Sequence, residues 1–133
     1  MGKSARILVV DDDPESTLAM CALLEGMGHI CRHVPKRAPV LEVLRSVGPD
    51  LALLDITVPD IGLDIARVIR RHAPRQPYLV AMTRWNHPDH RELALAAGFD
   101  AHVVRPVNTA TLERLVRAVP SSRPTAPMLA IVR

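Results

Sequence analysis

The stretch Ile7-Leu8-Val9-Val10-Asp11-Asp12-Asp13-Pro14 decides how this chain folds. Its four consecutive apolar residues predict a strand that is buried on both faces. The three carboxylates that follow repel one another unless a cation or a basic group joins them. A helix start comes next, with Asp13 as a candidate N-cap and Pro14 at the first helical position. Because ligands of open α/β sheets bind at the carboxyl ends of strands, these acids lie where a site is expected.

Three further predicted strands also end in a residue with useful chemistry. The apolar run 51–54 leads into Asp55, the run 78–82 into Thr83, and the run 101–104 into Arg105. If these strands are parallel neighbours, their carboxyl ends meet at one edge of the sheet. The acids, the hydroxyl and the cation would then form one composite site.

Helical periodicity alternates with these strands. Apolar spacing predicts helices over residues 14–27, 39–47, 63–73, 88–97 and 109–119, and a further strand over residues 29–34. Five strand–helix units joined by short loops predict a doubly wound α/β fold, with a parallel five-stranded sheet and helices on both faces. Residues 1–119 are expected to form this one domain, and residues 120–133 a Pro/Ser-rich tail or linker.

Composition narrows the function classes. The net charge of +3 and the pI of about 9.4 suggest nucleic-acid binding. However, the arginines are scattered, and the cluster between Arg67 and Arg75 is interpreted as a solvated helix face. No helix-turn-helix unit or aromatic platform is evident, so we expect no direct nucleic-acid contact.

The two cysteines and the hydropathy pattern indicate in which cellular compartment the protein is expected. No C-x-x-C pair, signal peptide or membrane-spanning apolar run is present. We therefore expect a reduced, cytoplasmic protein that makes no membrane contact. Cys21 on a helix and Cys31 on a strand are interpreted as separate packing residues.

The four strand ends, in this order and at this spacing, resemble the receiver domains of two-component response regulators, of the chemotaxis-regulator-like kind. The resemblance covers residues 6–119, nearly the whole chain. Together with right-handed crossovers, it implies the flavodoxin-like strand order 2-1-3-4-5. It also implies that Asp55 is the phosphoacceptor.

The resemblance further implies a Mg²⁺ site. Asp12 would be the direct ligand, Asp11 would act through water, Asp55 would supply an oxygen, and Thr57 its backbone carbonyl. A hard divalent cation would offset the charge of the phosphoryl oxygens and the carboxylates. The alternative is that residues 11–13 merely cap a helix, which accounts for Asp13 but not for all three.

The remaining site residues follow from the resemblance as well. Thr83 fits the switch hydroxyl that binds a phosphoryl oxygen, and Arg105 stands where the family usually has lysine. Arginine keeps the charge and binds phosphate in a bidentate manner, but it is longer and planar. His102 takes the place of a switch aromatic, with a partly exposed strand histidine as the alternative interpretation.

Two more features lie near the expected site. The loop between Asp55 and Gly62 is one residue shorter than is typical of the family, which must alter the turn into the next helix. Trp85, two residues after Thr83, is expected near the mouth of the site, where it would tune the chemistry.

The resulting expectation is a phosphoacceptor domain rather than an enzyme. A histidine kinase or histidine phosphotransfer protein would supply the phosphoryl group. A downstream protein would bind the face made by residues 88–97, 101–104 and 109–119. One alternative is a degenerate receiver used for docking without phosphorylation. A remote alternative is a haloacid-dehalogenase-like phosphatase. Members of that family have Thr or Val two residues after the second Asp of their motif, where this chain has Glu15.

Overall fold

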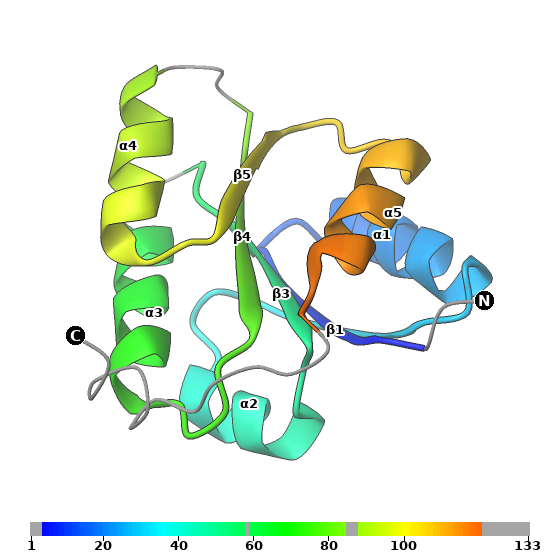
Figure 1. Cartoon of the computed structure of the whole chain (residues 1–133), viewed down its shortest axis with the longest axis horizontal. Coiled ribbons are helices and arrows are strands. Elements are labelled where there is room, and N and C mark those ends of the chain that lie inside the picture. Colours follow the sequence, from blue (N-terminus) through cyan, green and yellow to red (C-terminus); the bar gives the residue numbers. More distant parts are fainter. Residues whose placement is uncertain (1–3, 58, 85–87, 121–133) are drawn as a thin grey trace.

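A central parallel sheet organises the molecule. The computed structural model describes residues 4–57, 59–84 and 88–120. The five strands run in the order β2-β1-β3-β4-β5, as expected (Figure 1). Their bounds are β1 Arg6–Val10, β2 Ile30–Val34, β3 Leu51–Asp55, β4 Tyr78–Thr83 and β5 Ala101–Val104.

Helices cover both faces of this sheet. Helices α1 (Pro14–Gly26) and α5 (Thr109–Ala118) lie on one face, and α2 (Val40–Val47), α3 (Pro59–His72) and α4 (Pro88–Ala97) lie on the other (Figure 1). Asp13 caps α1 through Ser16 N–H, which confirms the N-cap prediction, and Asn108 caps α5 through Thr111 N–H. None of the described helices is long and apolar enough to cross a membrane.

The first apolar run serves both cores. Ile7 and Val9 pack in the cluster under α1 and α5, whereas Leu8 and Val10 pack in the cluster under α2, α3 and α4. Successive strand side chains point to opposite faces, so a strand with helices on both sides must be apolar throughout. This is why the quoted stretch shows no polar alternation until it reaches Asp11.

Strand register brings the predicted strand ends together. Val10 lies opposite Leu54, so Asp11, directly after β1, and Asp55, the last residue of β3, lie at the same edge of the sheet. Asp55 in turn lies opposite Met82, the residue before Thr83. The composite site predicted from the strand ends therefore forms at the carboxyl edge.

Helix α3 begins earlier than the sequence predicts, at Pro59 rather than at residue 63. The shortened loop leaves few residues for a turn, and proline is well suited to a first helical turn. A Cβ on Gly62 would lie 2.8 Å from the carbonyl oxygen of Asp55 and 2.5 Å from Cγ2 of Ile56. The glycine thus lets the first part of α3 lie directly against the end of β3.

The interpretation of the cysteines as separate packing thiols, and with it the expectation of a reduced protein, is wrong in this structure. Cys21 of α1 and Cys31 of β2 form a disulfide, with their Cα atoms 5.3 Å apart. The residues are ten positions apart in the sequence, and the turn between α1 and β2 brings them face to face. The bond ties α1 to the edge strand.

The interpretation of the basic cluster on α3 also needs correction at Arg70. Its guanidinium donates to the carbonyl oxygens of Gly98 and Pro77 and to Gln76, and it pairs with Asp100 at 2.7 Å. These contacts join the end of α3 to the loop between α4 and β5. Arg70 is therefore a structural residue and not part of a solvated face.

Candidate functional site

Asp55 lies at the centre of the carboxyl edge. Its Oδ1 accepts a hydrogen bond from Oγ1 of Thr57 at 2.6 Å and another from Thr57 N–H at 3.2 Å. Its Oδ2 lies 2.8 Å from Nζ of Lys36. Both oxygens of the carboxylate therefore have a donor, and the group is held in one orientation.

Lys36 is a site residue that sequence reasoning missed. It lies in the loop after β2, and its side chain and that of Asp55 are only 5 % and 9 % exposed. Its backbone N–H also donates to Oδ1 of Asp12 at 2.9 Å. A signal was present, because Lys36 follows the second predicted strand at the same sheet edge as Asp11, Asp55 and Arg105.

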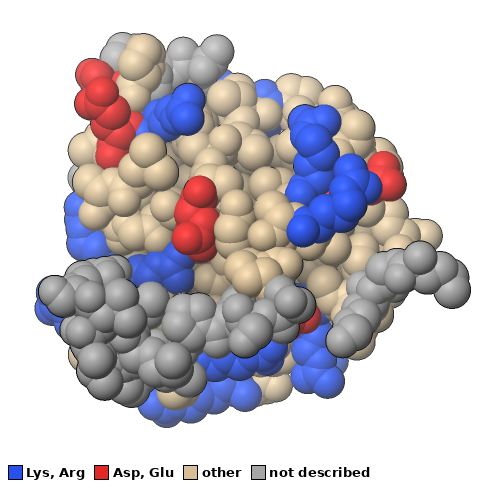
Figure 2. All heavy atoms as spheres, viewed as in Figure 1, with Lys and Arg blue, Asp and Glu red and all other residues tan. Residues whose placement is uncertain are grey.

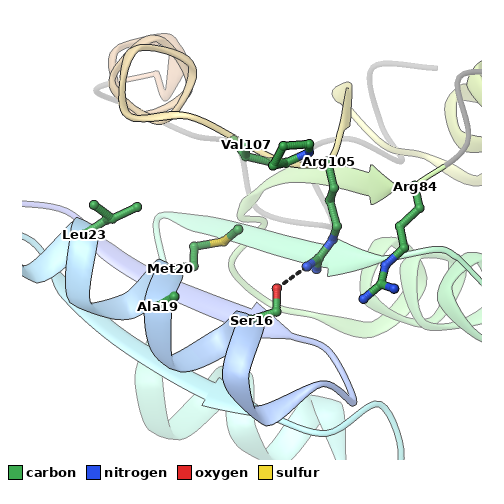
Figure 3. A pocket seen from close by; sticks show the side chains of 8 residues that line it. Ser16, Ala19, Met20, Leu23, Arg84, Arg105 and Val107 are labelled. Atoms are coloured by element: carbon green, nitrogen blue, oxygen red, sulfur yellow. Dashed lines mark hydrogen bonds between the residues drawn. The ribbon is translucent and has the colours of Figure 1, made fainter.

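Arg105 connects the end of β5 to the acids after β1. Its guanidinium pairs with Oδ2 of Asp11 and donates to the hydroxyl of Ser16 on α1. Figure 3 shows the side chain extending from the strand end to that serine. Its Nε is buried, lacks a hydrogen-bond partner in the described part of the chain, and lies 3.9 Å from Oδ1 of Asp55. The bond between Arg105 and Pro106 is cis.

The charges of the site keep Asp55 ionised. Burial alone raises the pKa of its carboxyl. The hydrogen bonds from Lys36 and Thr57 and the charges of Lys36 and Arg105 outweigh this effect and hold the pKa below its ordinary value. An ionised carboxylate is the form that attacks an electrophile, so Asp55 is held in the nucleophilic state.

The predicted Mg²⁺ ligands do not fit a metal ion as they are arranged here. Asp11 is paired with Arg105, Asp12 accepts from Lys36 N–H, and Asp55 is paired with Lys36 Nζ. Within the described ranges, no group of three or more His, Cys, Asp or Glu side chains is placed to hold a metal. The sequence argument allowed for either a metal cation or a basic group beside the carboxylates, and here the side chains of Lys36 and Arg105 pair with Asp55 and Asp11.

The two predicted switch residues lie on neighbouring strands. The Thr83 side chain is fully buried at the end of β4, and its carbonyl oxygen accepts from Arg105 N–H at 2.7 Å. His102 on β5 is half-buried, and its Nε2 has no hydrogen-bond partner among the described residues. Burial, followed by the nearby His90 and Arg91, lowers the pKa of His102. The prediction for Trp85 lies outside the described residues.

A pocket of about 500 Å³ opens beside the site, between α1 and the segment after β5. Its floor is apolar, with Met20 and Leu23 of α1 facing Val107 (Figure 3). Arg84 and Arg105 line its polar end. A partner that reached the site would meet an apolar surface and basic side chains together.

Comparison with known proteins identifies the family. Residues 7–117 match the family model described as the response regulator receiver domain. The chain belongs to this family. Receiver domains are signalling domains, and response regulators interact with histidine kinases.

Among relatives of this receiver, the DNA-binding response regulator MtrA of Mycolicibacterium smegmatis is 34 % identical over 85 % of the chain. A 14.6 kDa protein from the sodA1 3′ region of Leptolyngbya boryana is also 34 % identical, over 84 % of the chain and 86 % of its own length. The two-component response regulator PhoP of Pseudomonas aeruginosa is 32 % identical over 86 % of the chain. The receiver spans about half the length of MtrA and PhoP, 49 % and 51 % respectively.

Solved structures share the fold. The BeF3-activated N-terminal receiver domain of Klebsiella pneumoniae RstA is 26 % identical, with a TM-score of 0.77, and the match covers 87 % of this chain and 98 % of that one. A response regulator from Thermotoga maritima has a TM-score of 0.79 at 22 % identity, over 90 % of this chain and all of that one. The predicted fold class is therefore confirmed.

Proposed function

We propose that this receiver accepts a phosphoryl group on Asp55. The observation that carries the proposal is the buried Nε of Arg105, which has no hydrogen-bond partner among the described residues and lies 3.9 Å from Oδ1 of Asp55. A buried donor without a partner costs free energy, and a phosphoryl oxygen on Asp55 would supply the missing acceptor. The ionised state of Asp55 and its place at the end of β3 support the same role.

A histidine kinase or a histidine phosphotransfer protein is the proposed donor. The bond between phosphorus and the imidazole nitrogen would break while a bond to an Asp55 oxygen forms. Lys36 and Arg105 would offset the negative charge of the phosphoryl oxygens, and the Thr83 hydroxyl would donate to one of them. The apolar pocket beside Arg105 would receive the donor protein.

Mg²⁺ takes part in phosphorylation of receiver domains in general, and the sequence predicts it here. If an ion binds, Asp11, Asp12, Asp55 and the Thr57 carbonyl are the proposed ligands, and the ion would supply positive charge to the phosphoryl oxygens. Such binding requires the contacts of Lys36 and Arg105 with these carboxylates to open. The charge on Asp55 is already met by the protein's own cations.

The proposed output is a contact with a downstream protein through α4, β5 and α5. Leu93 and Leu95 on α4 are 44 % and 51 % exposed, so this face offers apolar surface to a partner. Thr83 and His102 would link Asp55 to it. Such a link would be a two-state switch driven by a local change of charge.

We propose no direct nucleic-acid contact for these residues, although MtrA is named as DNA-binding. Several of the arginines form ion pairs with carboxylates, including Arg67 with Asp64 and Arg75 with Asp50. On the face in Figure 2, the basic group at the upper right is separated from the one at the upper left by uncharged and acidic surface. A cytoplasmic location is also part of the proposal.

Phosphorylation by a small donor tests the proposal directly. Wild type incubated with acetyl phosphate should gain a single phosphoryl group, measured by intact-mass spectrometry and lost under mild alkaline treatment, as acyl phosphates are. Asp55→Asn should gain none, whereas Asp64→Asn, at an exposed carboxylate on α3, should behave as wild type. Equal labelling of Asp55→Asn and wild type would show that Asp55 is not the acceptor.

The second candidate function is docking without phosphorylation. The contacts of all three acids with Lys36 and Arg105 favour it, because each carboxylate already has a partner without any ligand. In this case acetyl phosphate and a histidine phosphotransfer protein would both leave the mass of the wild type unchanged, and Asp55→Asn would still bind the downstream partner.

A further inference from the structure

Lys36 engages the carboxylates on which a metal ion would depend. Its Nζ lies 2.8 Å from Oδ2 of Asp55, and its N–H donates to Oδ1 of Asp12 at 2.9 Å. Arg105 takes the remaining carboxylate, Asp11. A single lysine therefore holds two of the three predicted carboxylate ligands, and it reaches them from a loop that supplies none of them.

The loop keeps this lysine in place. Proline stands on both sides of Lys36, at Pro35 and Pro39, and restricts the backbone. Ala38 N–H donates to the carbonyl oxygen of Pro35 at 3.1 Å, which closes a turn around the lysine. The side chain is 5 % exposed, so its ammonium group is held against Asp55 and not free in solvent.

In this geometry the Lys36 ammonium group occupies Oδ2 of Asp55, and Oδ1 already accepts from Thr57, so neither oxygen is left open to a divalent cation. The ammonium group and the cation are both positive, and their repulsion is strong in a buried site. For a metal ion to reach Asp55, Nζ of Lys36 must leave its carboxylate, and the loop that holds it must open. The free energy of the Lys36–Asp55 pair is then lost, and metal affinity falls accordingly.

We infer that Lys36 is a resident cation that takes the place of the divalent metal ion in this receiver, so that Asp55 takes up a phosphoryl group without metal. The chemical part rests on the proposed function. With acetyl phosphate, the bond from phosphorus to the acetate oxygen breaks while a bond to an Asp55 oxygen forms. Acetate leaves, and no net proton or electron moves. The Lys36 ammonium faces the new phosphoryl group as a metal would.

Metal binding is the first arm of the test. Mn²⁺, a paramagnetic stand-in for Mg²⁺, is titrated into the protein, and free ion is counted by electron paramagnetic resonance. Wild type and Arg37→Met, which removes the exposed charge next to Lys36, should bind no Mn²⁺ at millimolar levels. Lys36→Met should bind Mn²⁺ at least ~10-fold more tightly than wild type, because the substitution removes the ammonium group that competes with the metal ion for Asp55. Equal Mn²⁺ affinity in wild type and Lys36→Met would overturn the inference.

Metal dependence of phosphorylation is the second arm. With acetyl phosphate and EDTA, wild type should be labelled at a rate that Mg²⁺ does not change. In EDTA, Lys36→Met should be phosphorylated roughly 100-fold more slowly than wild type, because one donor that stabilises the transition state is removed. Added Mg²⁺ should restore the rate of this variant. If wild type is labelled only with Mg²⁺, the inference is wrong but the proposed function stands.

The two arms also distinguish a failure of the proposed function from a failure of the inference about Lys36. If neither protein is labelled under any condition, the proposed function fails, and the Mn²⁺ arm alone then decides whether Lys36 excludes metal. If Lys36→Met does not fold, as judged by its amide NMR spectrum, Lys36→Gln replaces it. The gain of Mn²⁺ binding must then appear in that variant for the inference to hold.

Discussion

Nζ of Lys36 and Oδ2 of Asp55 lie 2.8 Å apart, with both side chains almost entirely removed from solvent. A buried pair is not in itself strong evidence of stabilisation, because desolvation of both charges opposes their attraction. The loss of one partner, however, leaves an uncompensated charge. The consequences of this relationship can be measured in the folded protein without any ligand.

A double-mutant cycle should detect this coupling. We expect Lys36→Met and Asp55→Asn each to lower the free energy of unfolding by about 3 kcal/mol, since each leaves a buried partner without its opposite charge. The free energy of unfolding of the double variant should fall by clearly less than the sum of the losses in the two single variants. Urea denaturation measures all four proteins, and additive losses would show that the two side chains do not interact in solution.

Stability should also depend on pH through Asp55. Its pKa is lowered in the folded protein, so the unfolded chain takes up the proton first as pH falls. The stabilisation is therefore complete above the ordinary carboxyl pKa of about 3.9 and is lost as pH falls from there through the lower folded value. Denaturation at a series of acidic pH values should show a shallower loss for Lys36→Met. Parallel curves for the two proteins would contradict this.

Arg105 should act as a structural link as well as a phosphate ligand. Arg105→Ala leaves Asp11 buried without its partner and frees Ser16, so we expect a loss of about 2–4 kcal/mol in the free energy of unfolding. Arg105→Lys should lose less, because it keeps the charge but cannot reach both partners with a planar fork.

The matched control for Arg105 is Arg84→Ala, in the same pocket. Arg84 is more than half exposed and pairs with Asp13 at 3.3 Å, so its loss should change stability by less than about 1 kcal/mol. If Arg105→Ala and Arg84→Ala unfold at the same urea concentration, the assigned role of Arg105 in holding α1 to β5 is wrong.

Beryllium fluoride, as a mimic of a phosphoryl group on Asp55, should move NMR signals of His102 and α4. The Thr83 hydroxyl would be drawn to the mimic, and the half-buried His102 ring on the adjacent strand would respond. Signals of α1 residues away from the pocket should stay largely unchanged. Changes confined to the neighbours of Asp55 would favour the docking function over switching.

The element pattern could be predicted from the sequence because it follows from local chemistry. The apolar run at residues 7–10 has to be buried on both faces, which predicts a central strand, and Asp13-Pro14 predicts the helix start that the structure shows. The start of α3 was misplaced, because it depends on how closely Gly62 packs against the end of β3. That contact is between elements, so no local pattern reports it.

Local sequence patterns were enough to predict the fold class and the presence of Asp11, Asp55, Thr83 and Arg105 at strand ends, and the resemblance implied the strand order. How the charges of these residues are met depends on the folded molecule. Lys36 reaches Asp55 across 19 positions of sequence, because parallel strands β2, β1 and β3 end at one edge. The Cys21–Cys31 bond likewise depends on the packing of α1 against β2. Sequence patterns identify which groups a chain carries, but the distances between side chains on different elements, which set electrostatic and covalent pairing, exist only in the folded molecule.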